Sequence, residues 1–185
     1  MADNPDTYPW APMSPATLNV RLIAVGAIWY ICGGWALDLW HGRQTRHHGD
    51  IEFCILRPDF PAFSAQFQDF DFYAAADGSL SLLANRTASP STGTQFWGCD
   101  PATKTFAFDL MIEPGNHAEW AYKRDPTMTE ERAHMLRLSA DGIPYLAAPG
   151  VLLFKAKYTR DKDQFDFEMA LPRLTPEDRE WLRRR

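Results

Sequence analysis

Cysteine, long apolar runs and surplus positive charge are all scarce in this sequence of 185 residues. The three cysteines, Cys32, Cys54 and Cys99, are scattered and show no Cys-x-x-Cys spacing. An odd number without that spacing argues against a disulfide framework and against a zinc site. It fits a reducing compartment, so we expect the protein in the cytoplasm.

Apolar runs are too short for a membrane span, which needs roughly 20 consecutive residues. Residues 18–39 come closest, but Arg21, the Gly33–Gly34 pair and Asp38 interrupt them. The sequence opens with Met-Ala-Asp-Asn-Pro, without a basic segment before an apolar one. We therefore expect no secretory signal and no contact with a membrane.

The formal net charge is -5, with 45% hydrophobic and 23% charged residues. This balance is typical of a globular protein with one core, or one domain with a helical appendage. It disfavours general nucleic-acid binding, which needs cations to neutralise phosphates. A cationic small-molecule partner would suit the negative surplus better.

The hydrophobic pattern predicts a mixed sheet with helices, an α+β fold class, in the first part of the chain. Ser14-Pro15 predicts the start of a helix that runs to about Val25. Asp77-Gly78 predicts a hairpin turn. Further elements are expected as a strand at 29–32, a helix at 35–40 closed near Gly42, a strand at 50–56, a helix at 59–68 and several strands between 72 and 113.

The second part of the chain has a different pattern. Residues 116–131 have mixed polarity, and their structure stays open at this point. The hydrophobic pattern of residues 149–158 and 161–171 has a helical period, and Thr175-Pro176 predicts a capped final helix. We therefore expect a domain at residues 1–144 and a helical C-terminal region at residues 145–185 that packs on it.

Two acids on alternate residues, Asp50 and Glu52, are the first candidates for chemistry. On a strand they would point to one face, while Ile51 and Phe53 face the core. Adjacent carboxylates repel each other unless a cation neutralises them. Mg²⁺ is a hard, oxygen-seeking ion that is often shared with substrate phosphates. A solvated strand face is the alternative reading.

The pair Gly33-Gly34 precedes these acids, at the start of the predicted helix. Glycines there let a phosphate approach the backbone amides, and the N-terminus of a helix adds partial positive charge. Arg46 and His48 lie in the loop between the glycines and the acids. Arginine suits bidentate contact with phosphate, although most surface arginines are simply solvated. Phosphates and a metal on one surface indicate nucleotidyl transfer.

These residues also resemble a known family. The order Gly-Gly, helical spacer, then Asp-hydrophobic-(Asp/Glu)-hydrophobic is similar to the nucleotidyltransferases related to DNA polymerase beta. More narrowly, Gly-Gly-Trp-Ala-Leu-Asp38 followed by Gly-Arg-Gln-Thr-Arg-His-His-Gly-Asp-Ile-Glu52 resembles the aminoglycoside-2''-adenylyltransferase family, whose close relatives include lincosamide nucleotidyltransferases. Residues 141–157 and the acids Asp163 and Asp166 resemble the C-terminal part of that family.

The resemblance implies a polymerase-beta-like nucleotidyltransferase fold and a set of site residues. The family's pattern includes a third carboxylate on a neighbouring strand. Asp109, on the less apolar face of a strand at 106–112, fits better than Glu113 at that strand's end. The metal ligands would then be Asp50, Glu52 and Asp109, with Asp109 placed to accept the acceptor's proton.

The resemblance also implies the nucleotide-binding residues. They would be Gly33, Gly34, Arg46, His48, Lys155 and Lys157, with one lysine reaching the triphosphate. Asp163 and Asp166 would orient the lysines or bind a cationic acceptor. For Lys155 and Lys157 the alternative is a solvated or dipole-pairing role at a helix end.

The expected function is Mg²⁺-dependent transfer of a nucleoside monophosphate, AMP from ATP, to a hydroxyl of a small molecule. An aminoglycoside-like or lincosamide-like compound is the expected acceptor. One alternative is a non-catalytic nucleotide-binding, regulatory or antitoxin-like domain of the same fold. Another is a transferase acting on tRNA or protein.

Overall fold

The computed structural model describes residues 4–185 and has an α+β fold. Its main sheet contains β1 (Trp29–Ile31), β2 (Glu52–Leu56), β3 (Asp71–Ala76), β4 (Ser79–Leu82), β5 (Gln95–Asp100), β6 (Thr105–Glu113), β9 (Leu136–Leu138) and β10 (Pro144–Leu146). The eight strands lie in the order β4-β3-β5-β6-β2-β1-β10-β9. The pairs β2–β6 and β1–β10 are parallel and the others antiparallel. The predicted mixed sheet is confirmed.

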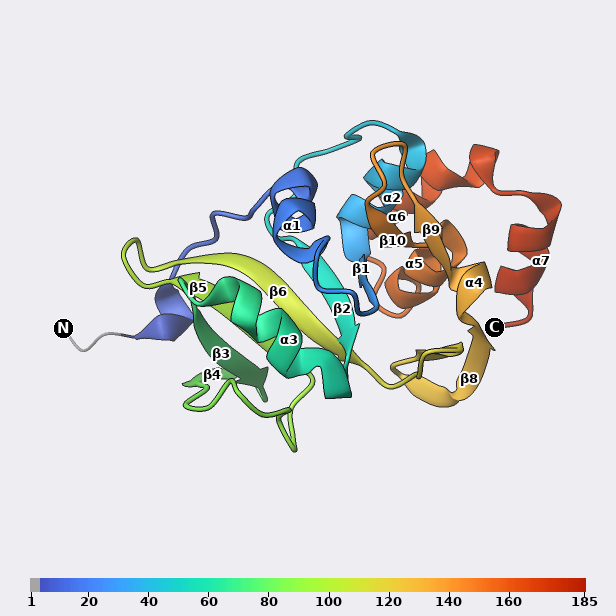
Figure 1. Ribbon diagram of the computed structural model, residues 1–185. Coiled ribbons are helices and arrows are strands. Elements are labelled where there is room, and N and C mark those ends of the chain that lie inside the picture. Colours follow the sequence, from blue (N-terminus) through green and yellow to red (C-terminus); the bar gives the residue numbers. More distant parts are fainter. Residues whose placement is uncertain (1–3) are drawn as a thin grey trace.

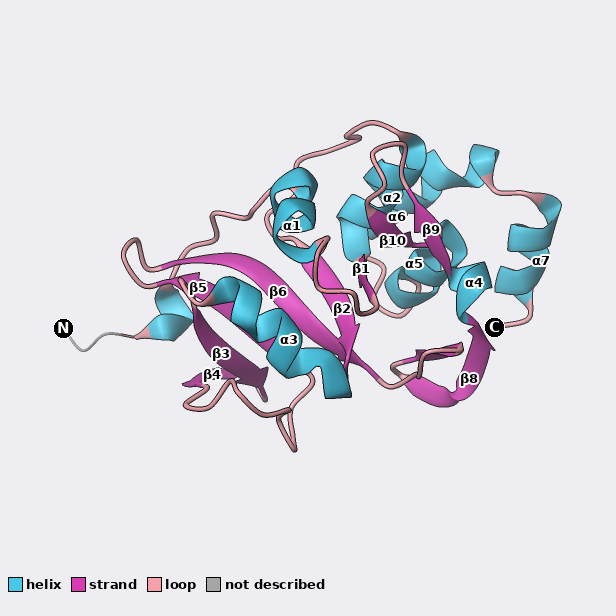
Figure 2. Cartoon of the chain, in the orientation of Figure 1, coloured by secondary structure: helices cyan, strands magenta, loops and turns pink. Residues whose placement is uncertain are grey.

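Helices cover the sheet in two groups (Figures 1 and 2). They are α1 (Pro15–Leu22), α2 (Gly33–His41), α3 (Phe60–Ser64), α4 (Arg132–Met135), α5 (Ala148–Lys155), α6 (Asp161–Ala170) and α7 (Pro176–Arg183). Figure 1 shows α2, α5, α6 and α7 together at one end of the molecule, beside β1 and β10. Helix α3 lies near β3, β5 and β6, where Phe60, Phe63 and Phe67 are fully buried. No helix among residues 4–185 is long and apolar enough to cross a membrane.

Helix ends follow the capping residues predicted from the sequence. The Ser14 hydroxyl accepts a hydrogen bond from the amide of Thr17, and Pro15 opens α1, which ends at Leu22, before Val25. Thr175 and Asp178 form a capping box at α7. Gly42 closes α2 in the left-handed conformation, with a φ of 72°. The turn between β3 and β4 has positive φ at both central residues, Asp77 and Gly78, as the hairpin prediction requires.

The elements nearest the predicted acids differ slightly from expectation. Helix α2 begins at Gly33, earlier than the predicted 35–40, so both glycines lie in its first turn. Strand β2 begins at Glu52, so Asp50 precedes it. Ile51 and Phe53 face the core as predicted, each 0% exposed. Asp109 lies in the middle of β6, on the side of Ala107 and Met111 that the alternation predicts, and it is 4% exposed.

Several elements of the second part were not predicted. Residues 116–131 contain a hairpin of β7 (Glu119–Tyr122) and β8 (Asp125–Glu131), which forms its own two-stranded sheet. Strands β9 and β10 join the main sheet through β1. Helix α5 ends at Lys155, which leaves Lys157 beyond it.

Two expectations from the sequence stay untested. The boundary between 1–144 and 145–185 is still a prediction, and β10 straddles it. The expectation of no secretory signal rests partly on residues 1–3, which lie outside the described residues.

Candidate functional site

Glu52 and Asp109 stand opposite each other on the neighbouring parallel strands β2 and β6. Paired positions of such strands project to the same face of the sheet, so the two acids share one face. Asp109 is 4% exposed, and Glu52 is partly buried. Asp50 is just ahead of β2, close enough for its charge to raise the pKa of both other acids. The fold therefore places Glu52 beside Asp109, with Asp50 near enough for its charge to act on both.

The surroundings of Glu52 and Asp109 disfavour the ionised form of both carboxyl groups. Burial, and then the charge of Glu52, raise the pKa of Asp109 to about 8. Burial, and then the charge of Asp50, raise the pKa of Glu52, while nearby Lys155 acts in the opposite direction. Proton retention or a bound cation relieves such repulsion.

One oxygen of Asp109 has no partner in the protein. Its Oδ2 accepts a hydrogen bond of 2.6 Å from the side-chain amide of Gln95, whereas Oδ1 is buried without a partner. A buried, unpartnered carboxylate oxygen next to a second carboxylate fits a hard divalent cation. No group of three His, Cys, Asp or Glu side chains among residues 4–185 is arranged to hold a metal ion. A cation here would draw its other ligands from substrate phosphates and water, as Mg²⁺ commonly does.

The glycine pair makes room for the side chains of the site. Gly33 has a φ of 63°, and a Cβ there would lie 1.8 Å from Oε2 of Glu52. A Cβ on Gly34 would lie 2.5 Å from the His48 ring and 2.6 Å from Nη2 of Arg46. Both glycines thus let site residues pack against the first turn of α2, whose free backbone amides favour anions.

His48 links the loop after α2 to that helix. Arg46 Nη1 donates to His48 Nδ1 at 3.0 Å, and His48 Nε2 lies 2.5 Å from Asp38 Oδ2. Arginine can only donate, so Nδ1 accepts and the proton is on Nε2. Burial lowers the pKa of His48, which agrees with a neutral ring. Trp35 covers this ring at 4.6 Å between centroids.

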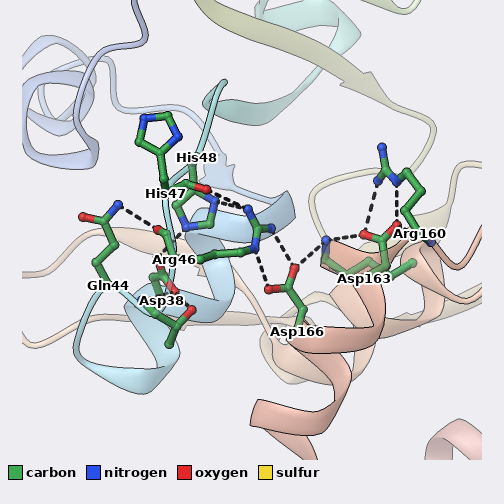
Figure 3. Close-up of polar contacts among 10 residues, drawn as sticks. Asp38, Gln44, Arg46, His47, His48, Arg160, Asp163 and Asp166 are labelled. Carbon is green, nitrogen blue, oxygen red and sulfur yellow. Dashed lines mark hydrogen bonds and ion pairs between the residues drawn. The ribbon is translucent and has the colours of Figure 1, made fainter.

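Arg46 continues the contacts towards the C-terminal helices, as Figure 3 shows. It donates to Asp166 through Nε at 2.8 Å and Nη2 at 2.7 Å. Lys155 Nζ lies 2.9 Å from both Asp163 and Asp166. Arg160 donates to Asp163 at 2.6 Å. The orienting contacts expected of Asp163 and Asp166 are therefore present for Lys155.

Lys157 takes no part in these contacts. Its ammonium lies 5.0 Å from the centre of the Tyr158 ring. Of the two predicted lysines, the structure brings only Lys155 to the acid pairs of α6.

A pocket of about 670 Å³ lies beside these groups. Four sequence candidates line it, Gly33, Glu52, Lys155 and Asp163, whereas Gly34, Arg46, His48, Asp50, Asp109 and Lys157 do not. Its aromatic wall contains Trp120, Phe154 and Tyr158, and its other cations are Lys123, Arg124 and Arg160. The pocket therefore combines carboxylates, cations and aromatic rings, a lining that suits an anionic ligand with a planar group.

Glu113, the competing third acid, is engaged elsewhere. Arg132 donates to its two oxygens at 2.8 and 2.7 Å, and the Tyr30 hydroxyl donates at 2.7 Å. A carboxylate with these buried partners is a structural anchor for β7 and α4 rather than a free metal ligand.

Sequence reasoning missed Gln95, Lys123, Arg160 and the role of Asp38. Asp38 belongs to the motif quoted above but carried no assigned role, although it accepts from Thr45 as well as His48. Gln95 becomes relevant only through the pairing of β5 with β6. Lys123 lies in the unpatterned segment 116–131, which held no signal for it.

Comparisons with known proteins agree with the resemblance seen in the sequence. Residues 18–82 match the family model described as aminoglycoside-2''-adenylyltransferase. The crystal structure of ANT(2'')-Ia in complex with adenylyl-2''-tobramycin superposes with a TM-score of 0.59 at 14% identity, covering 91% of each chain. The solution structure of the antibiotic-resistance factor ANT(2'')-Ia superposes with a TM-score of 0.53 at 17% identity, and the match covers 90% of this chain and 88% of that one. No curated protein sequence matches significantly. The structural matches show a shared fold.

Proposed function

We propose that this chain is a nucleotidyltransferase, on the grounds of the match of residues 18–82 to the aminoglycoside-2''-adenylyltransferase family model and of the shared fold. It transfers a nucleoside monophosphate, AMP from ATP, to a hydroxyl of a small-molecule acceptor and releases pyrophosphate. The observation that carries this proposal is the Glu52–Asp109 pair beside Gly33, at the edge of a pocket with several cations.

The chemistry assigns a role to each group. The acceptor oxygen forms a bond to the α-phosphorus, and the bond to the bridging oxygen breaks, so that its electron pair leaves with pyrophosphate. Asp109, opposite Glu52 on the neighbouring strand, is the group that takes the acceptor's proton. Lys155, the α2 amides and Arg46 hold the phosphates.

Glu52, Asp109 and Asp50 would hold Mg²⁺, which supplies charge neutralisation at the phosphates and lowers the repulsion among the acids. The support is the unpartnered Asp109 oxygen and the raised pKa of both Asp109 and Glu52, each caused by burial and then by the charge of a neighbouring acid.

The acceptor is expected to be cationic and aminoglycoside-like, with a lincosamide-like compound as the other choice. The support is the family match over residues 18–82 and the net charge of -5. The related ANT(2'')-Ia structure contains an adenylylated aminoglycoside, tobramycin.

The test has two steps. Thermal shift with Mg²⁺ and each nucleoside triphosphate should show stabilisation, of roughly 2.7 kcal/mol at 100 times the dissociation constant. Pyrophosphate release should then appear with a member of an aminoglycoside and lincosamide panel. Glu52→Gln and Asp109→Asn should remain folded and release no pyrophosphate. Failure to bind any triphosphate would refute the proposal, and binding without turnover on any acceptor would favour the non-catalytic alternative.

A further inference from the structure

Asp166 connects two cations from segments far apart in the sequence. Arg46, in the loop before β2, makes a bidentate pair with it through Nε and Nη2. Lys155, at the end of α5, contacts the same carboxylate at 2.9 Å. The Asp166 side chain is 2% exposed, so both contacts are shielded from water.

The two cations retain donors for a ligand. Lysine has three N–H donors, and the two carboxylates of Asp163 and Asp166 account for two on Lys155. Arg46 uses donors on Asp166, on the His47 carbonyl and on His48, which leaves one of its five. Lys155 lines the 670 Å³ pocket, and Arg46 packs on Gly34 at the start of α2.

We propose that Asp166 is a positioning residue, which holds Arg46 and Lys155 in the arrangement that binds the triphosphate. This inference rests on the proposed function. Asp166 contacts both cations but, unlike Lys155, does not line the pocket. Without it, two flexible cations would repel each other and lose the shared anchor that sets their directions.

Positioning and simple electrostatics predict opposite results for Asp166→Asn. Removing a negative charge near the pocket should strengthen binding of an anion if charge alone mattered. If Asp166 positions the cations, the variant should bind more weakly despite its more positive site, by about tenfold, which is about 1.4 kcal/mol.

The experiment measures the dissociation constants of ATP and of inorganic tripolyphosphate, both with Mg²⁺, by calorimetry on folded protein. Asp161→Asn is the matched control, because it changes the charge of α6 equally at an exposed position. It should leave both constants unchanged. Asp166→Glu is the second variant, which keeps the charge and shifts its position by one methylene. Positioning predicts weaker binding here as well, and this variant keeps the test informative if Asp166→Asn does not fold.

The outcomes separate the two proposals. If the wild-type protein binds neither probe, the proposed function fails and this inference falls with it. If the wild type binds, and Asp166→Asn binds as tightly or more tightly, only the positioning role is overturned. Wild-type affinity in Asp166→Glu would overturn it too. Weaker binding in both variants, with Asp161→Asn unchanged, supports it.

Discussion

Asp109 is buried next to another acid, and that position gives it an unusual titration. Burial, and then the charge of Glu52, raise its pKa from 3.8 to about 8. Below about pH 4 the folded and unfolded chains both hold the proton. Between about pH 4 and pH 8 the unfolded chain releases it and the folded chain keeps it, so stability falls as pH rises.

Asp109→Asn should therefore become more stable relative to the wild type as pH rises from 5 to 8. The gain should be on the order of a few kcal/mol in the absence of divalent cations, because the amide does not ionise. Urea unfolding in EDTA at both pH values measures it. If the free energies of unfolding of variant and wild type differed by the same amount at pH 5 and pH 8, the raised pKa of Asp109 would be contradicted.

Glu113→Gln serves as the control at the same strand. Its carboxylate pairs with Arg132, so the substitution leaves a buried cation without its partner. We expect the free energy of unfolding to fall by about 3–5 kcal/mol at both pH values. The two acids of β6 should thus respond in opposite directions, one as a site residue and one as a structural anchor.

The first turn of α2 tolerates no side chain at position 33, because Glu52 packs against it. Gly33→Ala would place a Cβ 1.8 Å from Oε2 of Glu52 at a φ of 63°. We expect a strain cost of about 1–2 kcal/mol, together with displacement of the Glu52 carboxylate. The variant should lose the stabilisation by Mg²⁺ and triphosphate in a thermal shift assay.

Gly42→Ala is a matched control at the other end of the same helix. Gly42 has a φ of 72°, but nothing lies within 4 Å of a Cβ there. It should lose similar stability from strain and keep its full response to Mg²⁺ and triphosphate. Equal ligand responses in the two variants would show that the closeness of Gly33 to Glu52 has no part in binding.

Elements with strong local signals could be predicted from the sequence. The caps at Ser14, Gly42 and Thr175 and the Asp77-Gly78 turn depend on neighbouring residues only, and all four are confirmed. Strand β1 has only three residues but was predicted, because all three are apolar and buried. Strands β9 and β10 are equally short, but Arg137 interrupts the apolar residues of β9, and Pro144 opens β10, which is defined by pairing with the distant β1.

The candidate site shows the same limit. Alternation placed Ile51 and Phe53 in the core, but local pattern could not pair Glu52 with Asp109, which required the family resemblance. The contacts of Asp38 and Asp166 depend on how loop 43–49 folds back onto α2 and α6. Only the three-dimensional structure shows which polar residues are held together and which are exposed.

At the scale of the whole molecule, α5 brings the C-terminal region to the acids of the main sheet. Lys155 lines the pocket that also contains Glu52, and its side chain is 11% exposed. Lys157, two residues later, lies beyond the helix against Tyr158. The two lysines therefore have different expected roles, although the sequence presents them as equivalent.

Lys155→Met should raise the triphosphate dissociation constant about tenfold or more, since one charge-assisted hydrogen bond contributes on the order of 1.5–3 kcal/mol. It should also lower stability, because Asp163 and Asp166 lose a cation. The affinity must therefore be measured by calorimetry at a temperature where the variant is folded. Lys157→Met, with the same loss of charge, should leave the affinity unchanged. An unchanged constant in Lys155→Met would confine phosphate binding to α2 and the loop after it, since α5 would then serve packing alone.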